Sequence, residues 1–209
     1  VFAYNIIKEF KEKCIMKLIL LIGCMASGKD TILKEMINEG YAEPVISHTS
    51  RPMRKGEKDG IEYHFVSAEE MLKMKENNEF IEFKSYKVSN NEKWYYGVNK
   101  NSLEKGLSKN YILIVDITGM RQIKEYFKDD KNMEITTIFL DVDKETRIKR
   151  AIRRDDMTLE KVKEIERRLK ADDKEVYPFK EECDLILQNT NEEDFNYSCM
   201  KLAFILSDF

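Results

Sequence analysis

Residues 17–36 read KLILLIGCMASGKDTILKEM, and this stretch decides the fold. The apolar run KLILLI predicts a buried strand, and the run ILKEM predicts a helix. Between them lies GCMASGKDT (residues 23–31), bounded by glycines and closing on Gly28 and Lys29, which is the context that a phosphate-binding loop requires. Backbone N–H groups can surround phosphate oxygens there, and Lys29 adds a positive charge at the helix N-terminus. The alternative is an ordinary strand-to-helix turn that contains Gly-Lys by chance.

The loop differs at one position from the usual motif. The hydroxyl residue that normally follows the lysine is replaced by Asp30, and a hydroxyl comes one position later, at Thr31. Nucleotide kinases whose loop reads GKGT have the same delayed threonine, so the loop resembles their branch more than the GTPase branch. Asp30 and Thr31 both offer hard oxygen ligands that suit Mg²⁺, and the sequence leaves open which of them approaches the metal.

The composition predicts one soluble globular domain. The chain has 209 residues, 42% of them hydrophobic and 36% charged, with a formal net charge of −3. This length allows a full core, and the charge gives no global basic field for nucleic acid. The four cysteines are widely spaced without a CxxC pair, which disfavours a zinc or disulfide framework and favours a reducing cytoplasm. No apolar stretch approaches the roughly 18 residues that a membrane span needs.

Residues 1–15 are expected to be an N-terminal extension without a chemical role. Their charged side chains are too many for a signal peptide: Lys8, Glu9, Lys11, Glu12 and Lys13. The chain starts at Val1, and Met16 stands immediately before the first predicted strand. Met16 is therefore the expected natural start.

Strand-like and helix-like segments alternate along the rest of the chain. Strands are predicted at 44–47, 61–66, 79–88, 93–98, 111–115, 135–140 and 185–187. Further helices are predicted at 68–77, 119–127, 144–154, 159–174 and 192–206. Ser67 and Glu70 predict a capping box at the first of these helices, and a turn at 89–92 joins two strands. Alternating strands and helices favour an α/β fold with a parallel sheet covered on both faces.

The polar segment at 47–54 reads SHTSRPMR and carries two arginines three residues apart. Arg51 and Arg54, held by Pro52 in a non-helical segment, form a fork of donors that suits a phosphate. An isolated pair of this kind would usually belong to a solvated basic loop. Here KGEKDG and then Tyr63 follow, which makes the segment more specific.

Three motifs in this order resemble the guanylate kinase family: SHTSRPMRKGEKDGIEYHFVS (47–67), NNEFIEF (77–83) and WYYG (94–97). The resemblance extends over roughly residues 17–190. It implies a three-layer α/β P-loop kinase with a parallel core sheet, an inserted mixed α/β subdomain for the nucleoside monophosphate, and a helical lid. The implied division is a core (16–47, 99–142 and 173–190), a monophosphate-binding subdomain (48–98), a lid (143–172) and a C-terminal helix packed on the core (191–209).

The resemblance further implies transfer of the γ-phosphoryl group of MgATP to GMP and dGMP, in a cytoplasmic monomer or homodimer without nucleic-acid or membrane partners. The residues implied for ATP are Gly23, Ser27, Gly28, Lys29, Asp30, Thr31 and Asn189. Those implied for GMP are Ser47, Arg51, Arg54, Tyr63, Glu82, Tyr96, Gly97 and Asp116. Asn189 would otherwise be a plain turn residue, and Tyr63 and Tyr96 would otherwise be core or interface aromatics.

The chemistry of guanine supports a carboxylate at Glu82. Guanine presents two adjacent donors, the ring N1–H and the exocyclic amine, whereas adenine presents an acceptor at the ring position. Glu82 lies in an apolar strand pattern, so its alternative is an outward-facing strand residue. Three features depart from the family: Val98 replaces a serine that bonds the guanine carbonyl, Ile114 replaces an acidic residue, and the hairpin before Tyr96 is longer. One lost hydrogen bond would cost about 1–3 kcal/mol of discrimination.

A second basic cluster lies in the predicted helix 144–154. Arg147, Arg150 and Arg154 fall on one helical face, and Arg168 on the next helix can meet that face. The family resemblance implies that Arg150, Arg154 and Arg168 clamp the transferring phosphoryl group and act in catalysis with Lys29. The alternative is a solvated helix face in a charge-rich protein.

Two other functions stay open. The GKD of the loop and the SRP of residues 50–52 also resemble ribose bisphosphate phosphokinases, which need no base pocket, so Glu82 and Asp116 disfavour them. The other is an inactive guanylate-kinase-like module that binds proteins. Such modules tend to lose the phosphate loop, which this chain retains.

Overall fold

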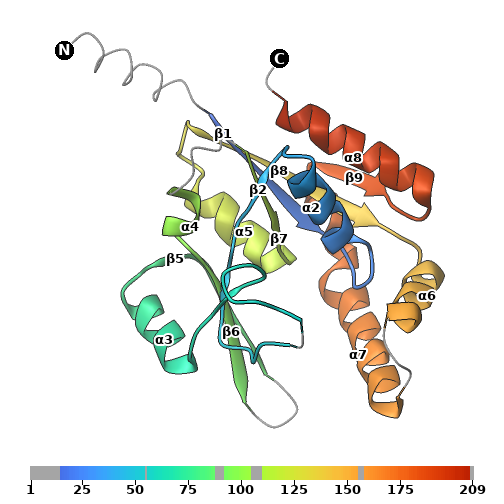
Figure 1. Ribbon diagram of the computed structural model, residues 1–209, viewed down its shortest axis with the longest axis horizontal. Helices are drawn as coiled ribbons and strands as arrows, with labels where there is room; N and C mark the ends of the chain where they lie inside the picture. Colours follow the sequence, from blue (N-terminus) through green and yellow to red (C-terminus); the bar gives the residue numbers. More distant parts are fainter. Residues whose placement is uncertain (1–14, 55, 88–91, 105–109, 155–157, 208–209) are drawn as a thin grey trace.

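The computed structural model describes residues 15–54, 56–87, 92–104, 110–154 and 158–207 (Figure 1). Nearly all of the expected N-terminal extension, and residues 89–91 of the expected turn, lie outside these ranges. None of the helices in the described part of the chain is long and apolar enough to cross a membrane.

A five-stranded parallel sheet forms the core, and its strand order is β2-β7-β1-β8-β9. The strands are β1 (Met16–Ile22), β2 (Glu43–Pro44), β7 (Asn110–Ile114), β8 (Met133–Asp141) and β9 (Leu185–Gln188). The central strand β1 alternates its side chains between two apolar clusters, and residues 18–22 are fully buried. Burial on both faces is typical of a central parallel strand, which explains why the sequence shows a continuous apolar run there.

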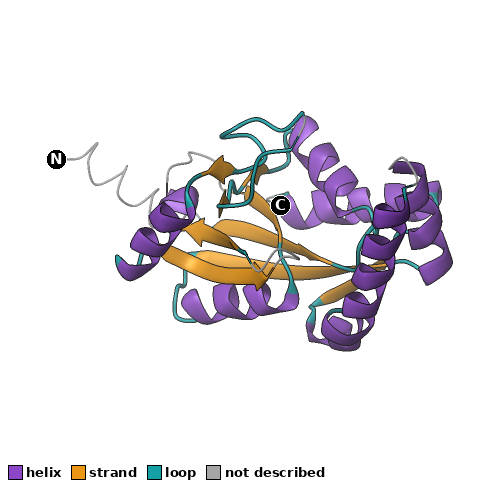
Figure 2. Cartoon of the chain, turned by 90° about the horizontal axis from the view of Figure 1, so that it is seen from below, coloured by secondary structure: helices purple, strands orange, loops and turns teal. Residues whose placement is uncertain are grey.

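Helices cover both faces of this sheet, so the core has three layers (Figures 1 and 2). Helices α2 (Lys29–Asn38) and α8 (Glu192–Leu206) pack on the face to which Ile19 and Leu21 point. Helix α5 (Ile117–Tyr126) and the 3₁₀ helix η1 (Tyr177–Glu182) pack on the opposite face. The predicted α/β fold with a covered parallel sheet is confirmed.

A separate four-stranded mixed sheet has the order β4-β3-β6-β5. Its strands are β3 (His48–Thr49), β4 (His64–Phe65), β5 (Phe80–Lys87) and β6 (Lys93–Asn99). Helix α3 (Ala68–Glu76) lies beside it and begins with the predicted capping box between Ser67 and Glu70, which is confirmed. A short helix, α4 (Asn101–Glu104), was not predicted.

Two predicted strands are wrong in extent. Only His64–Phe65 of the predicted strand 61–66 is a strand, because the N–H groups of Ile61 and Glu62 turn back to the carbonyl of Lys58. Hydrogen bonds within this turn replace the strand-to-strand hydrogen bonds that the alternating sequence pattern predicted. The predicted strand 44–47 is likewise reduced to β2, which ends at Pro44.

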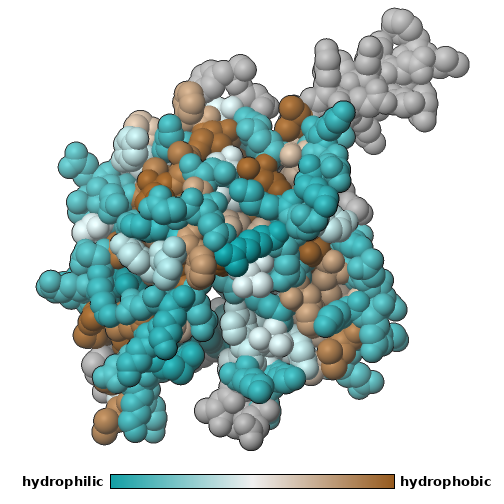
Figure 3. Space-filling model, turned by 180° about the vertical axis from the view of Figure 1, so that it is seen from behind, coloured by the Kyte–Doolittle hydropathy of each residue, from teal (hydrophilic) through white to brown (hydrophobic). Residues whose placement is uncertain are grey.

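Two helices project from the carboxyl end of the core sheet: α6 (Lys144–Arg154) and α7 (Leu159–Glu175). Both were predicted, and Thr158 caps α7 by accepting a hydrogen bond from the N–H of Lys161. They stand opposite strands β5 and β6, and a hollow separates the two sides when the molecule is seen from behind (Figure 3).

Gly97→Ala is expected to destabilise the four-stranded sheet. A Cβ atom at Gly97 would lie 2.7 Å from the ring of Phe80 and 3.0 Å from the carbonyl oxygen of Glu82. Overpacking of this kind costs about 1–3 kcal/mol. Urea unfolding of this variant beside Ser85→Ala, an exposed change on the same sheet, measures the effect, and equal stabilities would contradict it.

Candidate active site

The loop between β1 and α2 has the backbone that a phosphate-binding loop needs. Gly23 and Gly28 have φ values of +153° and +92°, which favour glycine. A Cβ atom at Gly23 would also lie 2.8 Å from the carbonyl oxygen of Leu140 in β8. The loop therefore packs too closely on the neighbouring strand to accept a side chain at this position.

Lys29, the first residue of α2, places its ammonium group inside this loop. Its Nζ atom donates to the carbonyl oxygens of Gly23 at 2.7 Å and Cys24 at 2.8 Å. Burial lowers the pKa of Lys29. Asp30 and Thr31 follow in the first turn of α2, where both are exposed.

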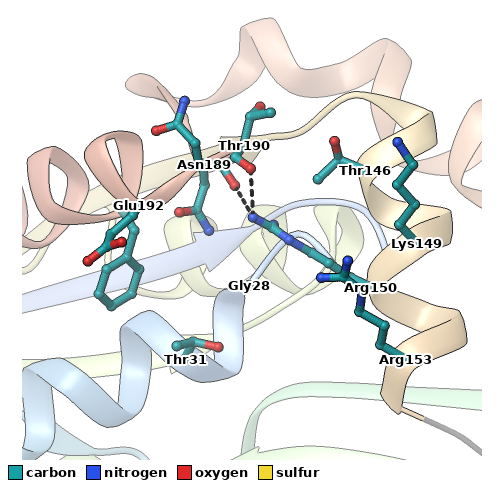
Figure 4. A pocket seen from close by; sticks show the side chains of 11 residues that line it. Gly28, Thr31, Thr146, Lys149, Arg150, Arg153, Asn189, Thr190 and Glu192 are labelled. Atoms are coloured by element: carbon teal, nitrogen blue, oxygen red, sulfur yellow. Dashed lines mark hydrogen bonds between the residues drawn. The ribbon is translucent and has the colours of Figure 1, made fainter.

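A first cavity, of about 490 Å³, lies between the loop, α6 and the segment after β9 (Figure 4). Gly28 and Thr31 of the loop side line it, together with Arg150, Asn189 and Thr190. Arg150 crosses the cavity wall and donates from Nη2 to the carbonyl oxygens of Asn189 at 2.8 Å and Thr190 at 3.1 Å. Helix α6 is thereby tied to the carboxyl end of β9.

Asn189 joins this segment to the phosphate loop, since its Nδ2 donates to the carbonyl oxygen of Ser27 at 2.7 Å. Both residues are almost fully buried. Among the described residues, the Oδ1 atom of Asn189 and the Nη1 atom of Arg150 are buried without a hydrogen-bond partner. Unpaired buried polar atoms are costly, so this cavity wall is suited to a polar ligand.

Because the family resemblance implies that Asn189 binds ATP, Asn189→Ala is expected to raise the KM for ATP several-fold and to lower the free energy of unfolding by about 1–3 kcal/mol. The carbonyl of Ser27, buried against the loop, would lose the donor that holds it. Steady-state kinetics and urea unfolding measure both effects. Gln188→Ala, an exposed change one residue earlier, is the control, and identical behaviour of the two variants would refute the prediction.

A second cavity, of about 470 Å³, lies on the other side of the loop. Five regions surround this cavity: Gly23 and Lys29 at the phosphate loop, the four-stranded mixed sheet (called the second sheet below), the turn before β4, the start of α5, and helix α7. The residues that line it from the second sheet, the turn before β4, the start of α5 and α7 include Tyr63, Lys84, Tyr86, Tyr96, Asp116, Arg167, Arg168 and Asp172. This second cavity is the hollow seen between the two sides of the molecule (Figure 3).

Three of the residues expected to bind GMP line this second cavity: Tyr63, Tyr96 and Asp116. The others do not: Ser47, Arg51, Arg54, Glu82 and Gly97. The guanidinium of Arg51 forms a bidentate ion pair with the carboxylate of Glu57, with N–O distances of 3.0 and 2.9 Å. The side chain of Arg51 is only 4% exposed. Arg54 is exposed, so the two arginines do not form a shared fork in this conformation.

Asp116 caps α5 and forms the centre of a polar cluster. Its Oδ1 accepts from the N–H of Gly119 at 2.8 Å, and its Oδ2 accepts from Tyr86 at 2.5 Å and lies 3.1 Å from the ammonium of Lys84. Burial acts against the charged carboxylate, but Lys84 and these hydrogen bonds outweigh it and hold the pKa of Asp116 below its usual value.

Lys84 and Tyr86 were not singled out from the sequence. They alternate with Glu82 along β5, so period-two spacing places all three on one face of the strand. Applying this spacing from Glu82 onward along the predicted strand 79–88 would have identified them.

The arginines that were expected in a lid lie in different places. Arg150 lines the first cavity and Arg168 the second, where its guanidinium pairs with Glu164 at 2.8 Å. The side chain of Arg154 lies outside the described part of the chain. Arg147, expected on the same open face, is instead 3% exposed.

Arg147 belongs to a buried link between helices α6 and α7 and the phosphate loop. Its Nη1 lies 3.1 Å from Oδ2 of Asp172 in α7, and the same oxygen accepts a hydrogen bond from the N–H of Met25 at 2.8 Å. Asp172 therefore connects α6, α7 and the phosphate loop through one carboxylate.

Together, the phosphate loop on a parallel sheet, the two cavities that share it and the flanking arginines define a P-loop nucleotide kinase. The sequence model of the guanylate kinase family matches residues 15–208. The chain belongs to the guanylate kinase family.

Individual relatives agree with this assignment. The chain is 37% identical to a guanylate kinase of Helicobacter hepaticus over 139 residues, which are 63% of this chain and 66% of that relative. It is 31% identical to a guanylate kinase of Legionella pneumophila (strain Lens) over 182 residues, 86% of this chain and 79% of that relative. The crystal structure of guanylate kinase from Anaplasma phagocytophilum shares the fold, with a TM-score of 0.63 at 22% identity, covering 93% of this chain and 86% of that one.

Proposed function

We propose that the protein transfers the γ-phosphoryl group of MgATP to the phosphate of GMP or dGMP, giving ADP and GDP or dGDP. One observation carries the proposal: two cavities of similar size meet at one phosphate loop, with Gly28 and Thr31 on one side and Gly23 and Lys29 on the other. Such an arrangement suits a phosphoryl donor and a phosphoryl acceptor that meet at Lys29.

ATP is assigned to the first cavity. The amine of adenine is a donor, and the buried Oδ1 of Asn189 is an acceptor without a partner among the described residues. The loop N–H groups and the N-terminus of α2 suit the phosphates. Gly23, Ser27 and Asp30 were also expected to bind ATP, and they remain part of the proposal. They belong to the phosphate loop segment and contribute to the shape or the charge of this site.

GMP is assigned to the second cavity. Tyr63 and Tyr96 line it on the side of the second sheet, and Asp116 offers a carboxylate to the base. The arginine pair at 51 and 54 is proposed to reach the phosphate of GMP when the second sheet moves toward the loop. The proposal also keeps three expected GMP residues that lie behind the side chains lining this cavity: Ser47, Glu82 and Gly97.

Mg²⁺ fits the donors that are present. Among the described residues there is no group of three or more His, Cys, Asp or Glu side chains that could hold a metal. Mg²⁺ in kinases is bound largely by substrate phosphates and water, with few protein ligands. We assign the hydroxyl of Thr31 to it because Thr31 lines the first cavity, whereas Asp30 does not. When bound, the ion neutralises charge on the phosphates.

The chemistry asks little of a general base, because the attacking oxygen of GMP is already an anion. The new bond forms between this oxygen and the γ-phosphorus as the bond to the β-phosphate oxygen breaks. Lys29 is placed to stabilise the charge of the transferring group. Arg150, Arg154 and Arg168 are proposed to join it when the helices of residues 143–172 close over the site and exclude water.

A coupled assay of ADP release with MgATP tests the proposal against GMP, dGMP, AMP, UMP, IMP and ribose 1,5-bisphosphate. The expected result is a strong preference for GMP and dGMP. Turnover with the sugar bisphosphate alone would assign a phosphokinase of that class. A folded protein that binds nucleotides without any turnover would be an inactive binding module.

The proposal includes the division into core, monophosphate-binding subdomain (48–98), lid (143–172) and C-terminal segment (191–209). It also includes a cytoplasmic enzyme, a monomer or a homodimer, that has neither a nucleic-acid nor a membrane partner.

A further inference from the structure

The outward face of helix α8 is apolar. Three large side chains follow one another along it at the spacing of one helical face, and we call them the α8 stripe: Tyr197, Met200 and Phe204. They are 53%, 64% and 61% exposed, respectively. Helix α8 lies at the periphery of the molecule (Figure 1), so the α8 stripe belongs to the molecular surface.

The face of α8 that packs on the core sheet is the opposite one. It carries Ser198, Leu202 and Leu206, which are almost fully buried. With about 3.6 residues per turn, the α8 stripe points away from these residues, on the other side of the helix. None of its three side chains lines either of the two cavities. Within the described part of the chain, neither the core nor the cavities account for three exposed apolar side chains in a row.

The α8 stripe has the composition of a protein–protein interface. A single exposed apolar residue is ordinary, whereas a contiguous group of them marks an interaction surface. Tyrosine, phenylalanine and methionine are enriched at such interfaces, and lysine and glutamate are depleted. In a chain that is 36% charged, the outward face of a surface helix would otherwise be expected to carry charges. The α8 stripe is therefore a candidate docking surface for another protein surface.

The charges beside the α8 stripe are ordered so that the helix complements itself. The first turn of α8 is acidic, and its exposed residue Glu193 lies four residues before Tyr197, on the same face. Toward the other end of the helix, the ammonium of Lys201 lies 5.9 Å from the centroid of the Phe204 ring. One end of this face is negative and the other is positive. A second copy of the helix, running in the reverse direction, matches both ends.

We propose that the α8 stripe is the interface of a homodimer, in which α8 of one copy packs antiparallel on α8 of a second copy across a two-fold axis. The axis passes between Tyr197 and Met200, so that Tyr197 of each copy contacts Met200 of the other. Glu193 then lies opposite Phe204 of the other copy, within reach of Lys201 beside that ring. Each contact is made twice, as in any isologous interface. The dimer is independent of which nucleotides the two cavities bind.

Sedimentation equilibrium over a range of protein concentrations tests the dimer. The unaltered protein is expected to show a reversible monomer–dimer equilibrium. Met200→Glu places a carboxylate in the centre of the interface and should raise the dissociation constant by at least about 30-fold, the effect of losing a residue that dominates the binding energy. Leu159→Glu is the control. It removes an even more exposed apolar side chain, 78% exposed at the start of α7, and should leave the dissociation constant unchanged.

Two charge reversals test the antiparallel arrangement. Glu193→Lys and Lys201→Glu should each raise the dissociation constant by about threefold to tenfold, because the dimer contains two such contacts and each becomes a repulsion. The double variant exchanges both charges and should return to within about twofold of the unaltered protein, since the attraction is restored. Additive losses in the double variant would show that these two side chains do not meet, and the inference would be wrong.

Other results would also overturn the inference. A protein that stays monomeric at every concentration at which it is soluble has no such interface, and a dimer that Met200→Glu does not weaken forms through another surface. Removal of residues 1–15 should leave the dimer intact. If this removal abolishes the dimer, those residues form the contact and the α8 stripe does not. Circular dichroism and thermal unfolding establish that each variant is folded, so that a lost dimer is not a lost fold.

Discussion

Lys29→Met is expected to lower kcat for GMP phosphorylation by about 10²–10³, whereas GMP still binds. Lys29 lines the second cavity beside the loop that both cavities share, and its ammonium lies 2.7 Å from the carbonyl oxygen of Gly23. Removing one charged group aimed at the transferring phosphoryl typically has an effect of this size. Methionine keeps the length of the side chain, so the loop should retain its packing. The coupled assay gives kcat, and calorimetry gives the affinity for GMP.

The control for this change is Lys34→Met, since Lys34 is an exposed residue of the same helix. The control should match the unaltered protein in both measurements. Retention of more than about a tenth of kcat by Lys29→Met would show that the phosphoryl group passes elsewhere, and the assignment of both cavities would then fail.

The phosphate loop and the core sheet could be predicted because their signals are local. A strand, a glycine-bounded loop and a helix start follow one another within 20 residues, and each of these elements is where it was expected. The closing helix at 192–206 was also predicted with its observed bounds. In such segments, the secondary structure that the periodicity of the sequence predicts is the one that tertiary packing also favours.

The errors arise where packing between distant segments decides the outcome. A helical wheel places Arg147 beside Arg150, but it carries no information that Asp172, 25 residues later, lies against that position. The strand predicted at 61–66 fails for a related reason, since Asp59 accepts from the N–H of Phe65 and helps to close a turn. The expected base site shows the same limit: alternation indicates that Glu82 and Lys84 share a face, but only the fold shows which of them reaches the cavity.

Asp172→Ala is expected to lower the free energy of unfolding by about 3–5 kcal/mol, the largest stability effect among the changes considered. The guanidinium of Arg147, 4% exposed at its side chain, would keep only the carbonyl oxygen of Val142 as a described partner, at 3.2 Å. The N–H of Met25 would also lose its acceptor. Breaking one side of a buried ion pair leaves an uncompensated charge in the interior. Urea unfolding followed by circular dichroism measures the loss.

Asp173→Ala is a matched control one residue away. Asp173 pairs with Lys144 at 2.8 Å, but both side chains are about half exposed, so its removal should cost no more than about 1 kcal/mol. Replacing both Arg147 and Asp172 by leucine should restore part of the stability, because no unpaired charge then remains buried. That double variant should still show a reduced kcat/KM for GMP, since Met25 keeps no acceptor to fix the loop. Equal losses from Asp172→Ala and Asp173→Ala would mean that the buried link does not hold helices α6 and α7 to the phosphate loop.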